Sequence, residues 1–105
     1  METITTQEQF NEITSQGVSL IDFAASWCMP CKMMAPLLDD LGKKFEGRAR
    51  FATLDVDEAA KVAVPFNISA VPTIMIFKDG NMADKLVGMQ NQETLETAVE
   101  AVLKK

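Results

Sequence analysis

Apolar residues are spaced along the chain in patterns that alternate between strand and helix. Val18–Ala24 is a mostly apolar run, and Thr73–Phe77 is another, as in strands that are buried on both faces. After Pro30, apolar residues recur at helical spacing as far as Leu41, which predicts an amphipathic helix. A last helix is predicted over Gln92–Leu103, with its apolar residues on one stripe.

Weaker patterns complete the order of elements. They predict strands at Glu2–Thr5, Arg50–Val56 and Met82–Val87, helices at Gln7–Gln16 and Glu58–Val64, and a tight turn at Lys78–Asn81. Thr6 is expected to cap the first of these helices and Gly17 to end it, and Pro65 is expected to stop the second. The order βαβαβαββα predicts one α/β domain over residues 1–105. Its central mixed sheet carries helices on both faces, is parallel in its first half and ends in an antiparallel hairpin.

Charge and hydropathy exclude several classes of protein. The net charge is −5, and basic residues gather only in pairs such as Lys43-Lys44 and Lys104-Lys105, so nucleic acid is not expected as a partner. No segment is long and apolar enough for a membrane span, and the residues from Met1 to Ile4 lack the pattern of a signal peptide. A cytoplasmic location and no membrane association are therefore expected.

Both cysteines of the chain lie within Trp27-Cys28-Met29-Pro30-Cys31. A disulfide that closes so short a loop removes only about 2 kcal/mol of unfolded-chain entropy, against about 5 kcal/mol for a long loop. The pair is therefore poorly placed for stability and well placed for reversible oxidation. In the cytosol such a pair is more often catalytic or metal-binding than structural.

The two thiols are expected to differ because Cys28 stands where a strand passes into a helix. The free N–H groups and the positive end of that helix favour a thiolate and should lower the pKa of Cys28 by about one unit. Cys31 lies one turn further on, where we expect it to be more buried and to remain a thiol. Cys28 is then the candidate that attacks a disulfide, and Cys31 the candidate that resolves the mixed disulfide.

Several motifs in this order resemble the thioredoxin family over nearly the whole chain. They are Asp22-Phe23, Trp27 to Lys32, Ala35-Pro36, Val71-Pro72-Thr73, and Lys78-Asp79-Gly80 followed by Val87-Gly88. The resemblance implies a thioredoxin fold, with a five-stranded mixed sheet flanked by four helices. It also implies a monomeric reductase of protein disulfides that holds no cofactor or metal. The redox-active group would be a Cys28–Cys31 disulfide. A thioredoxin reductase-like enzyme would reduce it, and disulfide-containing proteins would be its clients.

The resemblance also assigns a role to Asp22, which interrupts an apolar strand six residues before Cys28. In the family this carboxyl is buried behind the cysteines and exchanges a proton with the resolving cysteine, here Cys31. Burial should raise its pKa by up to about 3–5 units. Many members place a lysine near this carboxyl, but Thr53 stands at that position, so the rise should be less opposed.

The client-binding residues are likewise implied by resemblance. Val71 and Pro72 match a segment whose cis-proline lies against the disulfide and whose backbone pairs with an extended substrate. The other expected contacts are Trp27, Met29, Pro30, Gly88 and Met89. Two departures stand close to the cysteines: Met29 replaces the usual glycine, and Ala24 replaces a frequent tryptophan, which leaves volume beside the site.

Alternative functions remain open from the sequence. A thiol oxidase or isomerase would use the same residues at a higher reduction potential. A metal or iron–sulfur carrier would need a dimer, because two cysteines and no histidine cannot complete a four-ligand site of Cys and His. A non-catalytic docking subunit would keep the fold without the chemistry.

Overall fold

The structure is a computed structural model that describes residues 1–105. Its strands are β1 (Glu2–Ile4), β2 (Val18–Ala24), β3 (Ala49–Asp55), β4 (Thr73–Lys78) and β5 (Asn81–Val87). Its helices are α1 (Gln7–Thr14), α2 (Met29–Lys44), α3 (Ala60–Ala63) and α4 (Gln92–Leu103), with a 3-10 turn, η1, at Val64–Phe66. The predicted element order is confirmed.

The five strands form one mixed sheet in the order β1-β3-β2-β4-β5. Strand β3 pairs in parallel with β1 and with β2, whereas β4 pairs antiparallel with β2 and with β5. The expected parallel half and final hairpin are therefore both present. At the hairpin turn, Asp79 and Gly80 both have positive φ values, 51° and 88°, the conformation of a type I′ turn.

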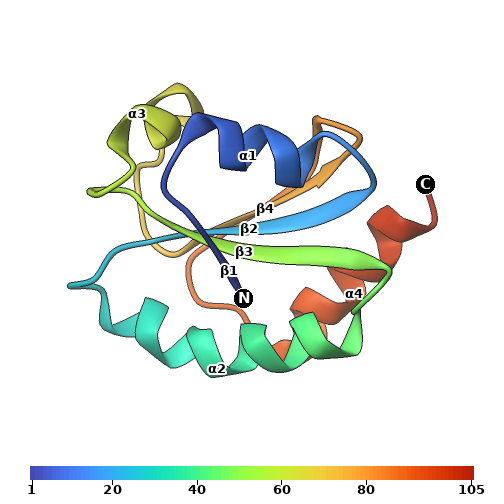
Figure 1. Cartoon of the computed structure of the whole chain (residues 1–105). Coiled ribbons are helices and arrows are strands. Elements are labelled where there is room, and N and C mark those ends of the chain that lie inside the picture. The colour runs from blue at the N-terminus through green and yellow to red at the C-terminus, as the bar shows by residue number, and fades with distance from the viewer.

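Two apolar cores lie on opposite faces of the sheet (Figure 1). Helices α2 and α4 cover one face, where Leu38 and Val99 pack against Leu20 of the central strand β2. Helices α1 and α3 cover the other face, where Phe10 and Ile21 belong to the second core. Alternate residues of β2 therefore enter different cores, which explains why the strand is apolar almost throughout.

Two helix boundaries differ from the prediction. Helix α1 ends at Thr14 rather than at Gln16, because Gly17 turns the chain at φ +70° and its N–H donates to Asp79 Oδ1 at 2.8 Å. The Glu58–Val64 helix was also predicted too long. Helix α3 begins later because the N–H groups of residues 57 and 58 donate to the side chain of Asp55.

Helix α3 ends at Ala63, before Pro65, but the chain then continues into a 3-10 turn that was not predicted. Pro65 lies in the first turn of η1, where the missing proline N–H breaks no hydrogen bond. The helical conformation ends two residues later at Asn67, which has φ 52°. The predicted end of β1 and both predicted bounds of β3 are shifted by one residue, and the bounds of β2 and α4 are confirmed.

Candidate active site

Cys28 is the N-cap residue of the 16-residue helix α2. Its Sγ atom accepts the backbone N–H of Cys31 at 3.2 Å, so the sulfur receives one of the helix's free donors. Pro30 lies in the first turn, where it breaks no helical hydrogen bond. An N–H donor and the positive end of the helix dipole both favour negative charge on this sulfur.

Cys28 and Cys31 form a disulfide with a Cα–Cα distance of 5.3 Å. In this oxidised state both residues are almost fully buried, at 4% and 5% exposure. The expectation that Cys31 is the more buried of the two is therefore wrong. The disulfide holds both sulfurs in one small apolar cluster with Ala25, so burial alone does not separate their roles.

Asp22 is buried in the middle of the sheet at 2% exposure. It lies on β2 between Thr53 of β3 and Ile74 of β4. Its Oδ1 atom is buried without a hydrogen-bond partner. Loss of hydration raises the pKa of Asp22 to about 7. Thr53, whose hydroxyl donates to the main-chain oxygen of Asp22 at 3.3 Å, opposes that rise. The carboxyl can therefore both accept and release a proton near neutral pH.

A pocket of about 250 Å³ is lined by both Asp22 and Cys31. Its wall includes Asp22, Ala24, Cys31, Ala35 and Thr53, which come from β2, β3 and α2. Small side chains at positions 24 and 53 leave this space open, as the sequence predicts for Ala24. A larger cavity of about 610 Å³ is lined by residues of α2 and β3 but by neither cysteine.

The segment before β4 lies against the other cysteine. The Val71–Pro72 peptide bond is cis, as the resemblance predicts. The Val71 carbonyl oxygen lies 3.7 Å from Cys28 Sγ, and the Pro72 carbonyl accepts the N–H of Gly88 at 2.8 Å. Gly88 has φ +87°, a conformation that glycine adopts without strain. The structure thus brings the end of β5 and the cis-proline beside Cys28.

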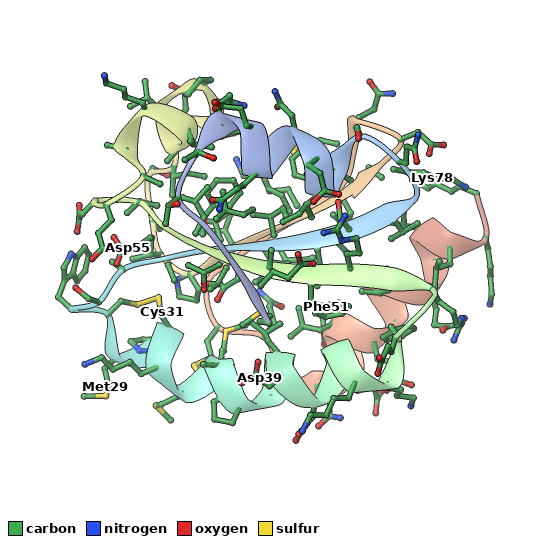
Figure 2. The ribbon with its side chains drawn as sticks, in the orientation of Figure 1. Met29, Cys31, Asp39, Phe51, Asp55 and Lys78 are labelled. Carbon is green, nitrogen blue, oxygen red and sulfur yellow. A yellow bond between two sulfur atoms is a disulfide. The ribbon has the colours of Figure 1, made fainter.

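Large apolar side chains lie exposed around the cysteines. Trp27 is 69% exposed, Met29 63% and Met89 52%. Figure 2 shows Met29 projecting outward from the start of α2, at the same end of the molecule as Cys31. An exposed apolar rim of this kind is typical of a surface that binds another molecule.

Two acidic residues that the sequence analysis missed hold this rim in place. Asp57 accepts the indole N–H of Trp27 at 2.8 Å, and Asp55 accepts the backbone N–H of Ser26 at 3.1 Å. Figure 2 shows Asp55 at the same end of the molecule as Cys31. The available signal was the acidic segment at the C-terminal end of the strand, where Asp55 is the last residue of β3 and Asp57 follows it. Because β2 and β3 are parallel neighbours, that segment must emerge beside the active-site loop.

Two further searches gave no additional site. No group of three or more His, Cys, Asp or Glu side chains is arranged to hold a metal ion. None of the helices has the length and apolar character required to cross a membrane.

Sequence comparisons identify relatives of the whole domain. The thioredoxin family model matches residues 2–101. A thioredoxin of Staphylococcus saprophyticus is 43% identical over 95 residues, which cover 90% of this chain and 91% of the relative. A thioredoxin of Staphylococcus aureus is 42% identical over the same shares of the two chains.

Solved structures agree with the sequence comparisons. A Plasmodium falciparum thioredoxin has a TM-score of 0.88 and 34% identity, covering 96% of this chain and 98% of its own. A mutant thioredoxin of Halobacterium salinarum has a TM-score of 0.91 and 32% identity, covering 97% of this chain and 89% of its own. With the disulfide at the start of α2, these matches establish that the chain belongs to the thioredoxin family and is a thiol–disulfide oxidoreductase with the redox-active pair Cys28–Cys31.

Proposed function

We propose that the protein reduces disulfides of client proteins, with Cys28 as the attacking thiolate and Cys31 as the resolving thiol. The main support is the N-cap position of Cys28, whose sulfur accepts the Cys31 N–H at 3.2 Å. Protonation of the Cys28 thiolate would lose the favourable interaction of its charge with this N–H group and with the end of the helix. Cys28 is therefore the better nucleophile and also the better leaving group near neutral pH.

The proposed reaction has two exchange steps. The Cys28 thiolate attacks one sulfur of the client disulfide, and the other client sulfur leaves as a thiolate that takes a proton from solvent. Cys31 then loses its proton and attacks the Cys28 sulfur, which closes the intramolecular disulfide. The second client sulfur leaves as a thiolate, so two electrons pass to the client and the protein is left oxidised.

Asp22 is the proposed acceptor of the Cys31 proton. Its carboxyl and Cys31 line the same pocket, and burial raises the pKa of Asp22 to about 7. An ordinary aspartate would be a far weaker base at this pH. A small bridging molecule such as water would carry the proton between the two groups, because Asp22 Oδ1 has no protein partner.

Clients are proposed to bind across the exposed rim on the Cys28 side. Trp27, Met29 and Met89 offer apolar area, and the Val71–Pro72 backbone lies against the nucleophile. The other proposed contacts are the backbone at Pro30 and Gly88. An extended segment on both sides of a client disulfide fits this surface, because backbone pairing tolerates many side chains.

The electron source is proposed to be a separate thioredoxin reductase-like enzyme. The chain has no nucleotide-binding motif, so electrons would arrive by thiol–disulfide exchange at Cys28. We further propose that the protein acts as a monomer in the cytoplasm, without a bound cofactor. Both proposals extend from the bacterial thioredoxins that it resembles.

Single-cysteine variants test the order of attack. Cys31→Ser should form a stable mixed disulfide with a protein client, because nothing resolves it. Cys28→Ser should form almost none with the same client. Non-reducing electrophoresis and peptide mass mapping measure both products. A mixed disulfide that forms at Cys31 as readily as at Cys28 would reverse the assignment.

Equilibration with a glutathione buffer tests the direction of electron flow. A reductase should lie near the potential of thioredoxin, about −270 mV. A potential near that of protein disulfide isomerase, about −180 mV, would instead support the oxidase or isomerase alternative. The oxidised fraction is read by alkylating free thiols and weighing the intact protein.

A further inference from the structure

The two sulfurs of the disulfide belong to different surfaces. Cys28 lies beside Val71 and the exposed rim, where clients are proposed to bind. Cys31 instead lines the pocket of about 250 Å³ behind the active site, and Cys28 is not part of that wall. Attack on a disulfide runs along the line of the S–S bond, so each sulfur must be approached from the side away from the other. Because Cys31 borders the pocket and Cys28 does not, a reagent in the pocket would approach the disulfide from the Cys31 side.

Attack from this side would release the more stable thiolate. A nucleophile that bonds to Cys31 expels Cys28, whose sulfur accepts the N–H of Cys31 at the start of α2. A nucleophile that bonds to Cys28 must expel Cys31, which receives no such bond. Because a less basic thiolate leaves faster, the chemistry favours attack on Cys31 wherever a reagent can reach it. Only steric access decides between the two sulfurs.

The pocket's dimensions and polarity define which reagent can enter. The pocket is open to the surface, and its volume of about 250 Å³ matches a molecule of roughly eight non-hydrogen atoms. Its wall includes the carboxyl-bearing residues Asp22 and Asp55 and two residues that carry ammonium groups, Lys32 and the N-terminal Met1. Asp22 Oδ1 is buried without a partner, although its residue is only 2% exposed, so a donor inside the pocket would satisfy it.

We propose that this pocket is a second entry to the disulfide, which admits small aminothiols and their disulfides to Cys31. The incoming thiol gives its proton to Asp22 and bonds to the Cys31 sulfur, and Cys28 leaves as a thiolate. A second thiol gives its proton to the Cys28 thiolate and attacks the outer sulfur of the adduct, and Cys31 leaves and recovers the first proton from Asp22. The sum is two thiols oxidised to one small disulfide and one protein disulfide reduced to two thiols. In reverse, the reduced protein reduces a small disulfide.

Cystamine and glutathione disulfide are the probes that separate this entry from the client surface. In Cys28→Ser, cystamine should modify Cys31 at least about tenfold faster than glutathione disulfide does, because only the smaller reagent enters the pocket. In Cys31→Ser, Cys28 should react with both. Mass spectrometry of the intact protein follows each adduct with time. Equal rates of the two reagents at Cys31, or no reaction there, would overturn the proposal.

Filling the pocket supplies the matched control. Ala24→Trp in the Cys28→Ser background should slow the cystamine reaction of Cys31 about tenfold or more, and in the Cys31→Ser background should leave the rate at Cys28 unchanged. Ala35→Leu narrows the same pocket from α2. It replaces Ala24→Trp as the pocket-filling variant if the tryptophan impairs folding. An unchanged Cys31 rate in a folded, filled variant would contradict the proposal. Trapping of a client at Cys28 is a separate experiment. The proposed function therefore stands even if the proposal of a second entry fails.

Discussion

Ser19 and Asp22 lie on the same central strand, and each buries an oxygen atom without a hydrogen-bond partner. They point to opposite faces of the sheet because their positions differ by three. Ser19 is on the side of Ile21, beneath α1 and α3, at the end of β2 remote from the cysteines. Asp22 is on the side of α2 and shares a pocket with Cys31.

The free-energy cost of burying a polar group does not depend on whether that group has a functional role. Both oxygens lose hydration on folding, which costs about 1–3 kcal/mol for a group left unsatisfied. Only Asp22 changes charge near neutral pH and only Asp22 adjoins a group that must gain or lose a proton. An unpaired buried oxygen is therefore not evidence of function by itself. Its place in the same pocket as Cys31 is what distinguishes Asp22.

The largest difference is expected in catalysis. Asp22→Asn keeps the shape of the side chain but cannot accept a proton, so resolution of the mixed disulfide at pH 7 should slow about 10²-fold. Ser19→Ala should leave the rate unchanged. Stopped-flow tryptophan fluorescence with a disulfide substrate measures both. If Asp22→Asn resolves as fast as the unaltered protein, with the same pH profile, then Asp22 has no role in proton transfer.

The second-largest difference between Asp22 and Ser19 is expected in the pH dependence of stability. Folding raises the pKa of Asp22 from 3.8 to about 7, so the folded state holds this proton more tightly than the unfolded state. Binding of this proton therefore contributes about 4 kcal/mol to the free energy of unfolding. This contribution is fully present below pH 3.8 and is lost as the pH rises through 7.

Urea unfolding of the oxidised protein at several pH values measures this loss. Asp22→Asn should remove it and should make the protein more stable than the unaltered one at pH 8. Ser19→Ala should retain the full pH dependence. A pH dependence that persists in Asp22→Asn would show that another group causes it.

Ser19→Ala should have a smaller effect, on stability alone. Removing a buried hydroxyl that has no partner relieves its desolvation cost, and the methyl group fills nearly the same space. The free energy of unfolding should rise by about 1 kcal/mol at every pH. Chemical denaturation at two pH values checks this. A loss of stability would mean that the hydroxyl makes a hydrogen bond in solution.

The smallest expected effect concerns the neighbour of Asp22. Thr53 opposes the rise in the pKa of Asp22, so Thr53→Val should raise that pKa further and move the pH profile of resolution upward. Thr53→Ser, which keeps the hydroxyl, should leave the midpoint in place. A downward shift in Thr53→Val would show that desolvation by Thr53 outweighs its hydrogen bond.

Local patterns predicted most of the fold. The bounds of β2 and α4 followed from a continuous apolar run and a clear helical stripe, and these elements matched residue by residue. The 3-10 turn at Val64–Phe66 was not predicted, because Pro65 was expected only to end a helix and not to lie in the first turn of another. The end of α1 depended on a hydrogen bond from Gly17 to Asp79, a partner 62 residues away.

The active site was predictable where its residues carry their own chemistry. The cysteine pair and the isolated Asp22 can be identified from the sequence alone, and the small residue at position 24 indicated free volume beside the site. The contact of Trp27 with Asp57 was not predictable from local pattern, because it requires the parallel pairing of β2 with β3. The equal burial of the cysteines also required the closed disulfide, which draws both sulfurs into one cluster.

The most direct measurement of the proposed electron transfer is the pH dependence of alkylation at each cysteine in the fully reduced protein. Mass mapping assigns the rate at every pH to Cys28 or to Cys31. We predict that Cys28 ionises below the ordinary cysteine value of about 8.5, while Cys31 still reacts as a protonated thiol at neutral pH. An ordinary or raised midpoint for Cys28, or faster alkylation of Cys31 at pH 7, would contradict the assigned roles.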